Sequence, residues 1–332
     1  MPVYLRLEAE DLARCRFAVS PLCETHEAVR TLTRRERHGY HQPWLRRTRT
    51  ALAGLDLSPL QLLMPVTGGY TPDFLGPPPE APFASAQGFA EELARVRATD
   101  AGTAHRELAR SLACTPGAAE SAAGRAMLAD PAAAVQRLAD VTARAWHALV
   151  EPDWPALRAL LEADVGYRTR QLAAGGLEAL FSDLHPDVTW ADQTLTVRGR
   201  SAFRLRQDVG GRGVLLLPSV FVWPDVVSGF APPWQPTVLY PARGMAELWQ
   251  RPPAAPPDTL VRLLGPNRAA LLGGLDEPAS TTVLARRYGL ALSSVSAHLR
   301  TLRDAGLLTA RRQGHQVLYA RTPLGHALLG GA

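Results

Sequence analysis

The chain has 332 residues, a net charge of +5 and 46% hydrophobic residues, which suits two domains with a full hydrophobic core. Its 36 basic residues are all Arg and its three Cys form no CxxC pair, so a disulfide framework is excluded. The longest apolar stretch, residues 214–227, is interrupted by Pro and Asp and is too short to span a bilayer. We therefore predict a cytoplasmic protein with no membrane partner.

Helical periodicity dominates the first half of the chain, and we predict a mainly helical region up to about residue 176. A short strand is expected at Val3–Leu7 and a helix at Glu8–Phe17. Ser20 and Pro21 suit the start of the next helix, because Ser caps free N–H groups and Pro needs no partner in the first turn. Further amphipathic helices are predicted at Phe89–Leu112, Pro131–Leu149 and Leu157–Leu172.

A basic segment, Arg30–Arg49, contains seven Arg and one Glu. Charge runs usually face solvent, so the favoured interpretation is a solvated surface that pairs with acidic residues elsewhere. Direct contact with DNA is the alternative.

Residues 177–250 have a different texture, with β-branched and aromatic runs broken by Gly, Pro and Asp. This pattern predicts a small antiparallel sheet. The aromatic residues of this region favour a packed core, since aromatics at strand spacing are more often packing than ligand contacts. They are also the candidate pocket for an apolar small-molecule effector, and the residues considered for it are Trp190, Phe221, Trp223, Trp234 and Tyr240.

Charge and proline content divide the chain near residue 250. A proline-rich linker, residues 251–257, separates a body, residues 1–250, from a C-terminal module, residues 258–332. The module carries nine Arg and four acidic residues, so it holds a surplus equal to the whole net charge of the chain. A basic module on a neutral body is typical of a nucleic-acid-reading domain attached to a second functional part.

The C-terminal module contains the pattern of a helix-turn-helix. Ser280 can cap a first helix, and Gly289 can end it in a left-handed conformation. A second helix is predicted from the spacing of Val295, Leu299 and Leu302, and Gly306 ends it. Two helices joined by a tight turn, with small polar side chains on the outer face of the second, suit the DNA major groove.

A hairpin with Gln313-Gly314-His315 at its turn is predicted to follow, with strands at residues 307–312 and 316–321. Its Arg side chains place positive charge where a phosphate backbone would run. The residues predicted to contact DNA are Ser293, Ser294, Ser296, Ala297, His298, Arg300, Arg303, Arg311, Arg312 and His315.

The module resembles the ArsR/SmtB-type bacterial transcriptional regulators. The matching stretches are LARRYGL (284–290), VSAHLRTLRDAGLL (295–308), RRQGHQVLYAR (311–321) and TPLG (322–325). It departs from the family at Ala291, where a capping Ser is common, unless Ser293 caps a shortened helix, and at Val283, which removes a capping box. The resemblance implies a transcriptional regulator that binds double-stranded operator DNA.

The body looks like the domain of unknown function that precedes such a winged helix in many actinomycete regulators. The residues that suggest it are RFAVSPL (16–22), PWLRR (43–47), LPSVFVWP (217–224) and PPWQPTVLYPARG (232–244). This resemblance implies a transcription factor and gives no ligand.

Motifs of enzymes and metal sites are sparse. There is no GxSxG, P-loop, HExxH or strand-following GxGxxG motif, and the cluster around Asp183, His185 and Asp187 fits a loop better than an acid–base site. The module has His298, His315 and His326 but no Cys, which disfavours thiolate-rich metal sensing. We predict no cofactor, metal or catalytic residue.

The sequence thus predicts an α+β protein, with a mainly helical body carrying a small antiparallel sheet, followed by a winged helix-turn-helix. The expected function is a homodimeric transcriptional repressor released by an apolar small-molecule effector. The alternatives are a metal-sensing repressor of the same type and an enzyme with an appended DNA-binding domain.

Overall fold

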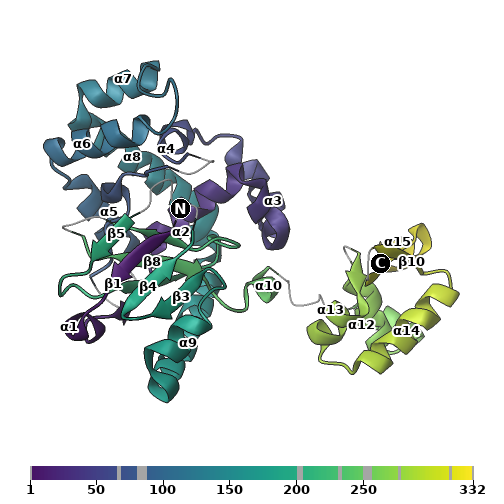
Figure 1. Cartoon of the computed structure of the whole chain (residues 1–332). Helices are drawn as coiled ribbons and strands as arrows, with labels where there is room; N and C mark the ends of the chain where they lie inside the picture. The colour runs from purple at the N-terminus through teal and green to yellow at the C-terminus, as the bar shows by residue number, and fades with distance from the viewer. Residues whose placement is uncertain are drawn as a thin grey trace. The chain divides into compact units, whose positions relative to one another are not determined.

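The computed structural model describes residues 2–65, 69–80, 88–199, 205–230, 234–249, 256–275, 278–313 and 316–330. The chain divides into two compact units, Met1–Trp249 and Gln250–Ala332 (Figure 1). The predicted mixed α+β fold class is confirmed. Residues 251–255 of the predicted linker lie outside the described residues.

Helices form most of the first unit. They are α1 (Ala9–Leu12), α2 (Pro21–Thr33), α3 (His38–Leu52), α4 (Ser58–Leu62), α5 (Gly88–Arg97), α6 (Ala101–Leu112), α7 (Ala122–Ala129), α8 (Pro131–Ala145), α9 (Trp154–Ser182) and α10 (Met245–Leu248). A π-helical turn, Trp146–Val150, continues α8, and Gly176, with φ of +66°, interrupts α9. Among the described residues, no helix combines the length and the apolar character needed to cross a membrane.

Two predicted helices differ from the structure. The helix expected at Phe89–Leu112 is divided into α5 and α6, because the Asp100 side chain accepts a hydrogen bond from the N–H of Thr103 and starts a new helix there. The helix expected at Glu8–Phe17 ends at Leu12. Its last two residues form strand β2, since they pair with a strand about 200 residues later in the chain.

The strands of this unit form two four-stranded sheets. The first has the order β3 (Val188–Ala191), β4 (Thr194–Val197), β1 (Val3–Arg6) and β5 (Leu205–Asp208). The second has the order β2 (Arg16–Phe17), β6 (Leu215–Ser219), β8 (Thr237–Pro241) and β7 (Val227–Gly229). The prediction of one small antiparallel sheet is wrong in its pairing, because β1 runs parallel to β5 and β6 runs parallel to both β2 and β8.

The second sheet is buried on both faces. Leu216 of β6 and Val238 of β8 pack in a core shared with Leu5 of β1 in the first sheet. Leu215 and Leu217 face the other way, in a cluster that also holds Ala18, Val222 and Leu239. Alternating residues of a strand point to opposite faces, so β6 needs apolar side chains at consecutive positions.

Helix α2 packs its polar N-terminal turn against the rest of the unit through buried carboxyl groups. Ser20 Oγ accepts a hydrogen bond from the N–H of Cys23, at 2.9 Å, which confirms the predicted cap. Glu92 of α5 accepts bonds from the hydroxyl of Ser20 and the N–H of Leu22. Glu24, only 1% exposed, accepts a bond of 3.0 Å from the N–H of Val220, just after β6.

The buried carboxyl of Glu24 predicts a pH-dependent stability. Burial raises its pKa from 4.5 to about 8, so the folded state holds this proton more tightly than the unfolded state and is destabilised as pH rises between these values. Gln has nearly the same shape as the neutral acid and does not titrate. We measure the free energy of unfolding in urea for the variant and for the wild type. We expect the difference, Glu24→Gln minus wild type, to be larger at pH 8.5 than at pH 5.5. Glu178→Gln, on the exposed part of α9, is the control. If Glu24→Gln changes the free energy of unfolding by the same amount at both pH values, the prediction is contradicted.

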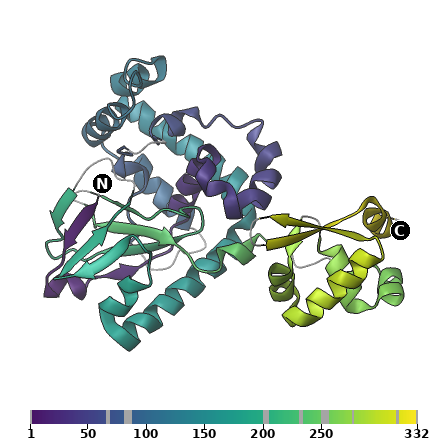
Figure 2. The same cartoon turned by 45° about the vertical axis from the view of Figure 1, so that its right-hand side comes forward.

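The second unit has the element order of a winged helix. Its elements are α11 (Asp258–Leu264), α12 (Pro266–Gly273), β9 (Ala279–Ser280), α13 (Thr281–Tyr288), α14 (Leu292–Asp304), β10 (Leu308–Gln313), β11 (Gln316–Arg321) and α15 (Pro323–Gly330). Strands β10, β11 and β9 form an antiparallel sheet in that order. Figure 2 shows the β10–β11 hairpin as two long strands beside the helices of this unit.

Candidate nucleic-acid interface

The turn between α13 and α14 is set by glycine and by backbone hydrogen bonds. Gly289 has φ of +63°, a left-handed conformation that glycine adopts without steric cost. The N–H of Leu290 bonds to the carbonyl oxygen of Ala285 at 3.0 Å, which closes the end of α13. At the other end of α13, the N–H of Val283 donates to Ser280 Oγ at 3.4 Å. These contacts confirm the predicted start and stop of the first helix.

Helix α14 has one apolar and one polar face. Val295, Leu299 and Leu302 are buried in the core of the unit, as predicted. On the rest of the helix, the exposed residues predicted to contact DNA are Ser293, Ser294, Ala297, Arg300 and Arg303, and the half-buried ones are Ser296 and His298. At 100° per residue, Ala297 and Arg300 lie on the side opposite Val295. The outer face of α14 therefore presents small polar side chains and one guanidinium group to solvent.

No side chain caps the start of α14. Ala291 has an extended conformation, with φ of −63° and ψ of 140°, and the helix begins at Leu292. The alternative of a shortened helix capped by Ser293 is therefore not realised. Ser293 and Ser294 belong to the first turn of this helix, whose free N–H groups suit a phosphate oxygen.

The Arg side chains of α14 and of the hairpin differ in whether a neighbouring acidic residue offsets their charge. Arg303 forms an ion pair of 2.8 Å with its neighbour Asp304, which offsets part of its charge. Arg311 is exposed on β10, opposite Leu318 of β11. The backbone of Arg312 belongs to β10, but the positions of its side chain and of His315 lie outside the described residues. Arg300 and Arg311 are thus the predicted DNA contacts whose charge is presented most directly.

The five residues considered for an effector pocket do not enclose one cavity. Phe221 and Tyr240 are fully buried in different core clusters. Trp190 packs on Phe181, with ring centroids 5.5 Å apart, and Trp223 packs edge-on to Tyr40 at 4.6 Å. Trp234 lines a hollow formed mainly by polar residues of α6 and the segment before it. Four of the five side chains therefore have packing roles, as the favoured interpretation stated.

The basic segment Arg30–Arg49 is only partly a solvated surface. Arg35, Arg46, Arg47 and Arg49 are exposed, but Arg34 and Arg37 are buried. Arg37 pairs with Glu27 at 2.6 Å and with Asp225 at 3.2 Å. The predicted pairing with acidic residues elsewhere is confirmed for Arg34 and Arg37. Their predicted exposure to solvent is wrong, because a carboxylate about 190 residues away allows their charge to be buried.

The cluster around Asp183, His185 and Asp187, which was predicted to be a loop, can be placed. His185 Nε2 lies 3.1 Å from the carbonyl oxygen of Pro224, and the N–H of Asp187 donates to His185 Nδ1. Asp183 instead pairs with Arg168 at 2.9 Å. These bonds organise a loop. Within the described ranges, no three His, Cys, Asp or Glu side chains gather in a group able to hold a metal ion.

Comparison with protein families identifies both parts of the chain. Residues 83–246 match the model of a family of unknown function, DUF5937, and residues 263–311 match that of a helix-turn-helix domain. Searches of curated proteins and of solved structures gave no match. The helix-turn-helix match contains all of α12, α13 and α14, the elements whose geometry is described above. The chain therefore carries a DUF5937 domain followed by a C-terminal helix-turn-helix domain.

Proposed function

We propose that this protein is a sequence-specific transcriptional repressor that binds double-stranded operator DNA as a homodimer. The observation that carries the proposal is the exposed polar face of α14, which has Arg300 at its centre and lies in the same small unit as the Arg311-bearing hairpin. A helix with this face enters a major groove, and a hairpin beside it follows the phosphate backbone.

We assign the first unit to sensing and dimerisation rather than to catalysis. In this proposal a small molecule binds the first unit and releases the protein from DNA. Such a ligand acts only if its affinity differs between the DNA-bound and free forms. Support for dimerisation comes from the size of the DNA-binding unit, because one winged helix covers too little DNA to select a genomic site.

Arg311 provides a test of the hairpin as a phosphate contact. Neutralising one phosphate releases condensed counterions, so Arg311→Ala should weaken binding to all DNA sequences alike. It should also reduce the slope of log affinity against log salt by about one per subunit. Fluorescence anisotropy over a salt series measures both quantities. Arg125→Ala, on the exposed face of α7, removes the same charge from the first unit and should leave the slope unchanged. Lost affinity with an unaltered slope would exclude the phosphate contact.

Arg300 provides a test of base recognition. A guanidinium group that bonds to both acceptors of a guanine gives about 1–3 kcal/mol of discrimination, and Lys keeps the charge without this planar fork. We expect Arg300→Lys to relax specificity at one base position per half-site and to retain non-specific affinity, whereas Arg300→Ala should lose both. Selection of bound fragments from a random DNA library, followed by sequencing, measures specificity for each variant. Unchanged preferences in both variants, with uniformly weaker binding, would instead make Arg300 a phosphate contact.

The homodimer proposal predicts a strict geometry of the operator. Two-fold related reading helices require half-sites about 34–36 Å apart, which is one helical turn of DNA. Native mass spectrometry should therefore find two chains on each selected duplex. Insertion of half a helical turn between the half-sites should sharply weaken binding, because it rotates one half-site to the opposite side of the DNA. A single bound chain whose affinity is insensitive to this insertion would refute the dimer.

A further inference from the structure

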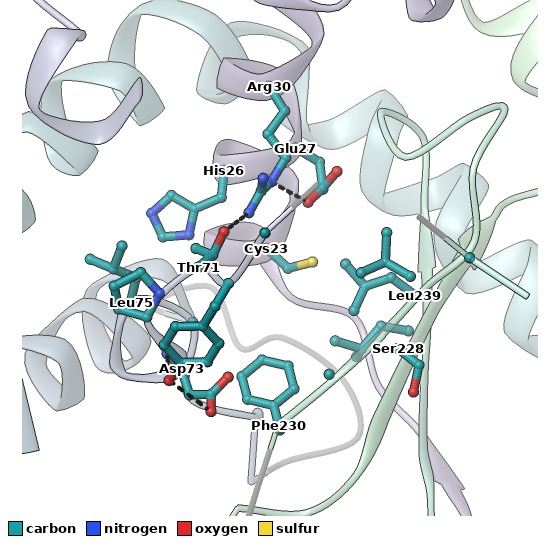
Figure 3. Close-up of a pocket in the computed structure, with 18 of the residues that line it drawn as sticks. Cys23, His26, Glu27, Arg30, Thr71, Asp73, Leu75, Ser228, Phe230 and Leu239 are labelled. Atoms are coloured by element: carbon teal, nitrogen blue, oxygen red, sulfur yellow. Dashed lines mark hydrogen bonds and ion pairs between the residues drawn. The ribbon is translucent and has the colours of Figure 1, made fainter. Parts of the chain in front are cut away.

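A cavity of about 260 Å³ lies within the first unit, between α2, residues 69–79 and strands β6, β7 and β8 (Figure 3). Its volume lies just below the range of about 300–1,000 Å³ found for small-molecule sites. Most of the helix and loop residues that line the cavity come before residue 83 in the sequence, where the DUF5937 match begins. None of Trp190, Phe221, Trp223, Trp234 and Tyr240 lines it.

One wall of the cavity is polar and is built on α2. Arg30 Nε lies 3.0 Å from Glu27 Oε1, and a terminal nitrogen of Arg30 donates to Thr71 Oγ1 at 2.6 Å. Figure 3 shows both contacts beside the open space, with the Arg30 guanidinium held between them. Arg30 is therefore fixed in place at the cavity by residues on two separate segments.

The same wall carries more positive than negative charge. Arg34 and Arg37 also line the cavity, and both pair with Asp225. Arg37 additionally pairs with Glu27 at 2.6 Å. Three guanidinium groups thus share two carboxylates, which leaves a surplus of one positive charge. The side chain of Arg30 is 15% exposed, compared with 7% for Arg34 and 0% for Arg37, so the surplus is most accessible at Arg30.

Other ionisable groups at the cavity do not change this balance. Asp73 accepts a bond from the Tyr70 hydroxyl, and Arg110 stacks on the Tyr70 ring at 3.9 Å. Both groups contact Tyr70, and their opposite charges cancel in the count. Burial lowers the pKa of His26 to about 4 and raises that of the Cys23 thiol, so both side chains are neutral near pH 7.

The opposite wall is apolar. Leu217 of β6, Leu239 of β8 and Val227 of β7 line it, together with Phe230. Figure 3 shows the ring of Phe230 and the side chain of Leu239 on the side of the cavity away from Arg30. An occupant would therefore contact charge at one end and hydrocarbon along its body.

We propose that this cavity is the binding site of a small organic anion. Its acidic group is placed beside Arg30 and Thr71, and its apolar body lies along Leu217, Leu239 and Phe230. The charged group binds through charge-assisted hydrogen bonds, which are stronger than neutral ones, and balances the surplus charge of the wall. That the anion acts as the effector rests on the proposed function, whereas the site itself does not.

Two dyes with one skeleton test the site in the full-length chain. 8-Anilinonaphthalene-1-sulfonate is an apolar anion, and N-phenyl-1-naphthylamine is the same aromatic body without the sulfonate. In fluorescence titrations we expect the anion to bind about tenfold more tightly than the neutral dye, the factor expected for one charge-assisted hydrogen bond. Equal affinities, or no saturable binding of the anion, would overturn the proposal.

Variants of two lining residues locate the binding. Arg30→Gln should weaken binding of the anion about tenfold and change binding of the neutral dye less than twofold, and Arg30→Lys should restore most of the loss. Arg47→Gln is the matched control, because Arg47 is an exposed residue paired with Asp153 outside the cavity.

If Arg30→Gln fails to fold, Gly229→Leu decides instead. A Cβ at Gly229 meets no atom within 4 Å, so a larger side chain fills the space and should block both dyes. Unchanged anion affinity in the folded Arg30→Gln or Gly229→Leu variant would overturn the proposal.

Operator affinity measured with and without saturating anion separates the two proposals. Lower DNA affinity in the wild type, absent in Gly229→Leu, supports the site as the effector site. Anion binding with the predicted charge selectivity but unchanged DNA affinity upholds the site and overturns only its regulatory role. A chain that binds no DNA overturns the proposed function, and the dye titrations still decide the site.

Discussion

The guanidinium group of Arg37 is the contact on which the first unit most depends. It is fully buried and donates to Glu27 on α2, to Asp225 and to the carbonyl oxygen of Phe221, both of which follow β6. A buried ion pair is tolerated only when its hydrogen bonds are satisfied, and removing one partner costs about 3–5 kcal/mol. Arg37 thus links the helical part to the segment that follows β6, and it lines the cavity together with Arg30.

The location of strands was predictable from the sequence, but their partners were not. The strand predicted at Val3–Leu7 coincides closely with β1, Val3–Arg6. β-branched and apolar runs mark a strand, yet they do not encode which segment pairs with it. Strand β1 joins β4 and β5 from about 190 residues away, and β2 joins β6 in the same manner. The burial of Arg37 escaped prediction for the same reason, since its partner Asp225 is remote in the sequence.

The winged helix was predicted more completely because its determinants are local. The positive φ angles of Gly289 and Gly306 and the spacing of Val295, Leu299 and Leu302 can all be inferred within a few residues. The proposed ligand site shows the opposite case. Aromatic content pointed to Trp190–Trp249, but large rings mostly fill core space. The cavity instead arises where α2 faces β6 and β8. Its one local signal was the density of Arg after residue 30, which was interpreted as surface.

Helix α2 connects the charge network and the cavity. Glu27, which binds Arg37, also binds Arg30 at 3.0 Å, so the surplus charge is shared by groups that support the packing of the unit. Although burial opposes ionisation of Glu27, Arg37 and Arg30 together lower its pKa, which shows how strongly the carboxylate is held by both. An anion beside Arg30 would add the missing negative charge, and it would stabilise the arrangement of α2 in which the cavity exists. For such an anion to control DNA binding, the fraction of molecules in this arrangement must differ between free and DNA-bound protein. The physical basis of such control is therefore the uneven count of three guanidinium groups and two carboxylates in a place that water reaches poorly.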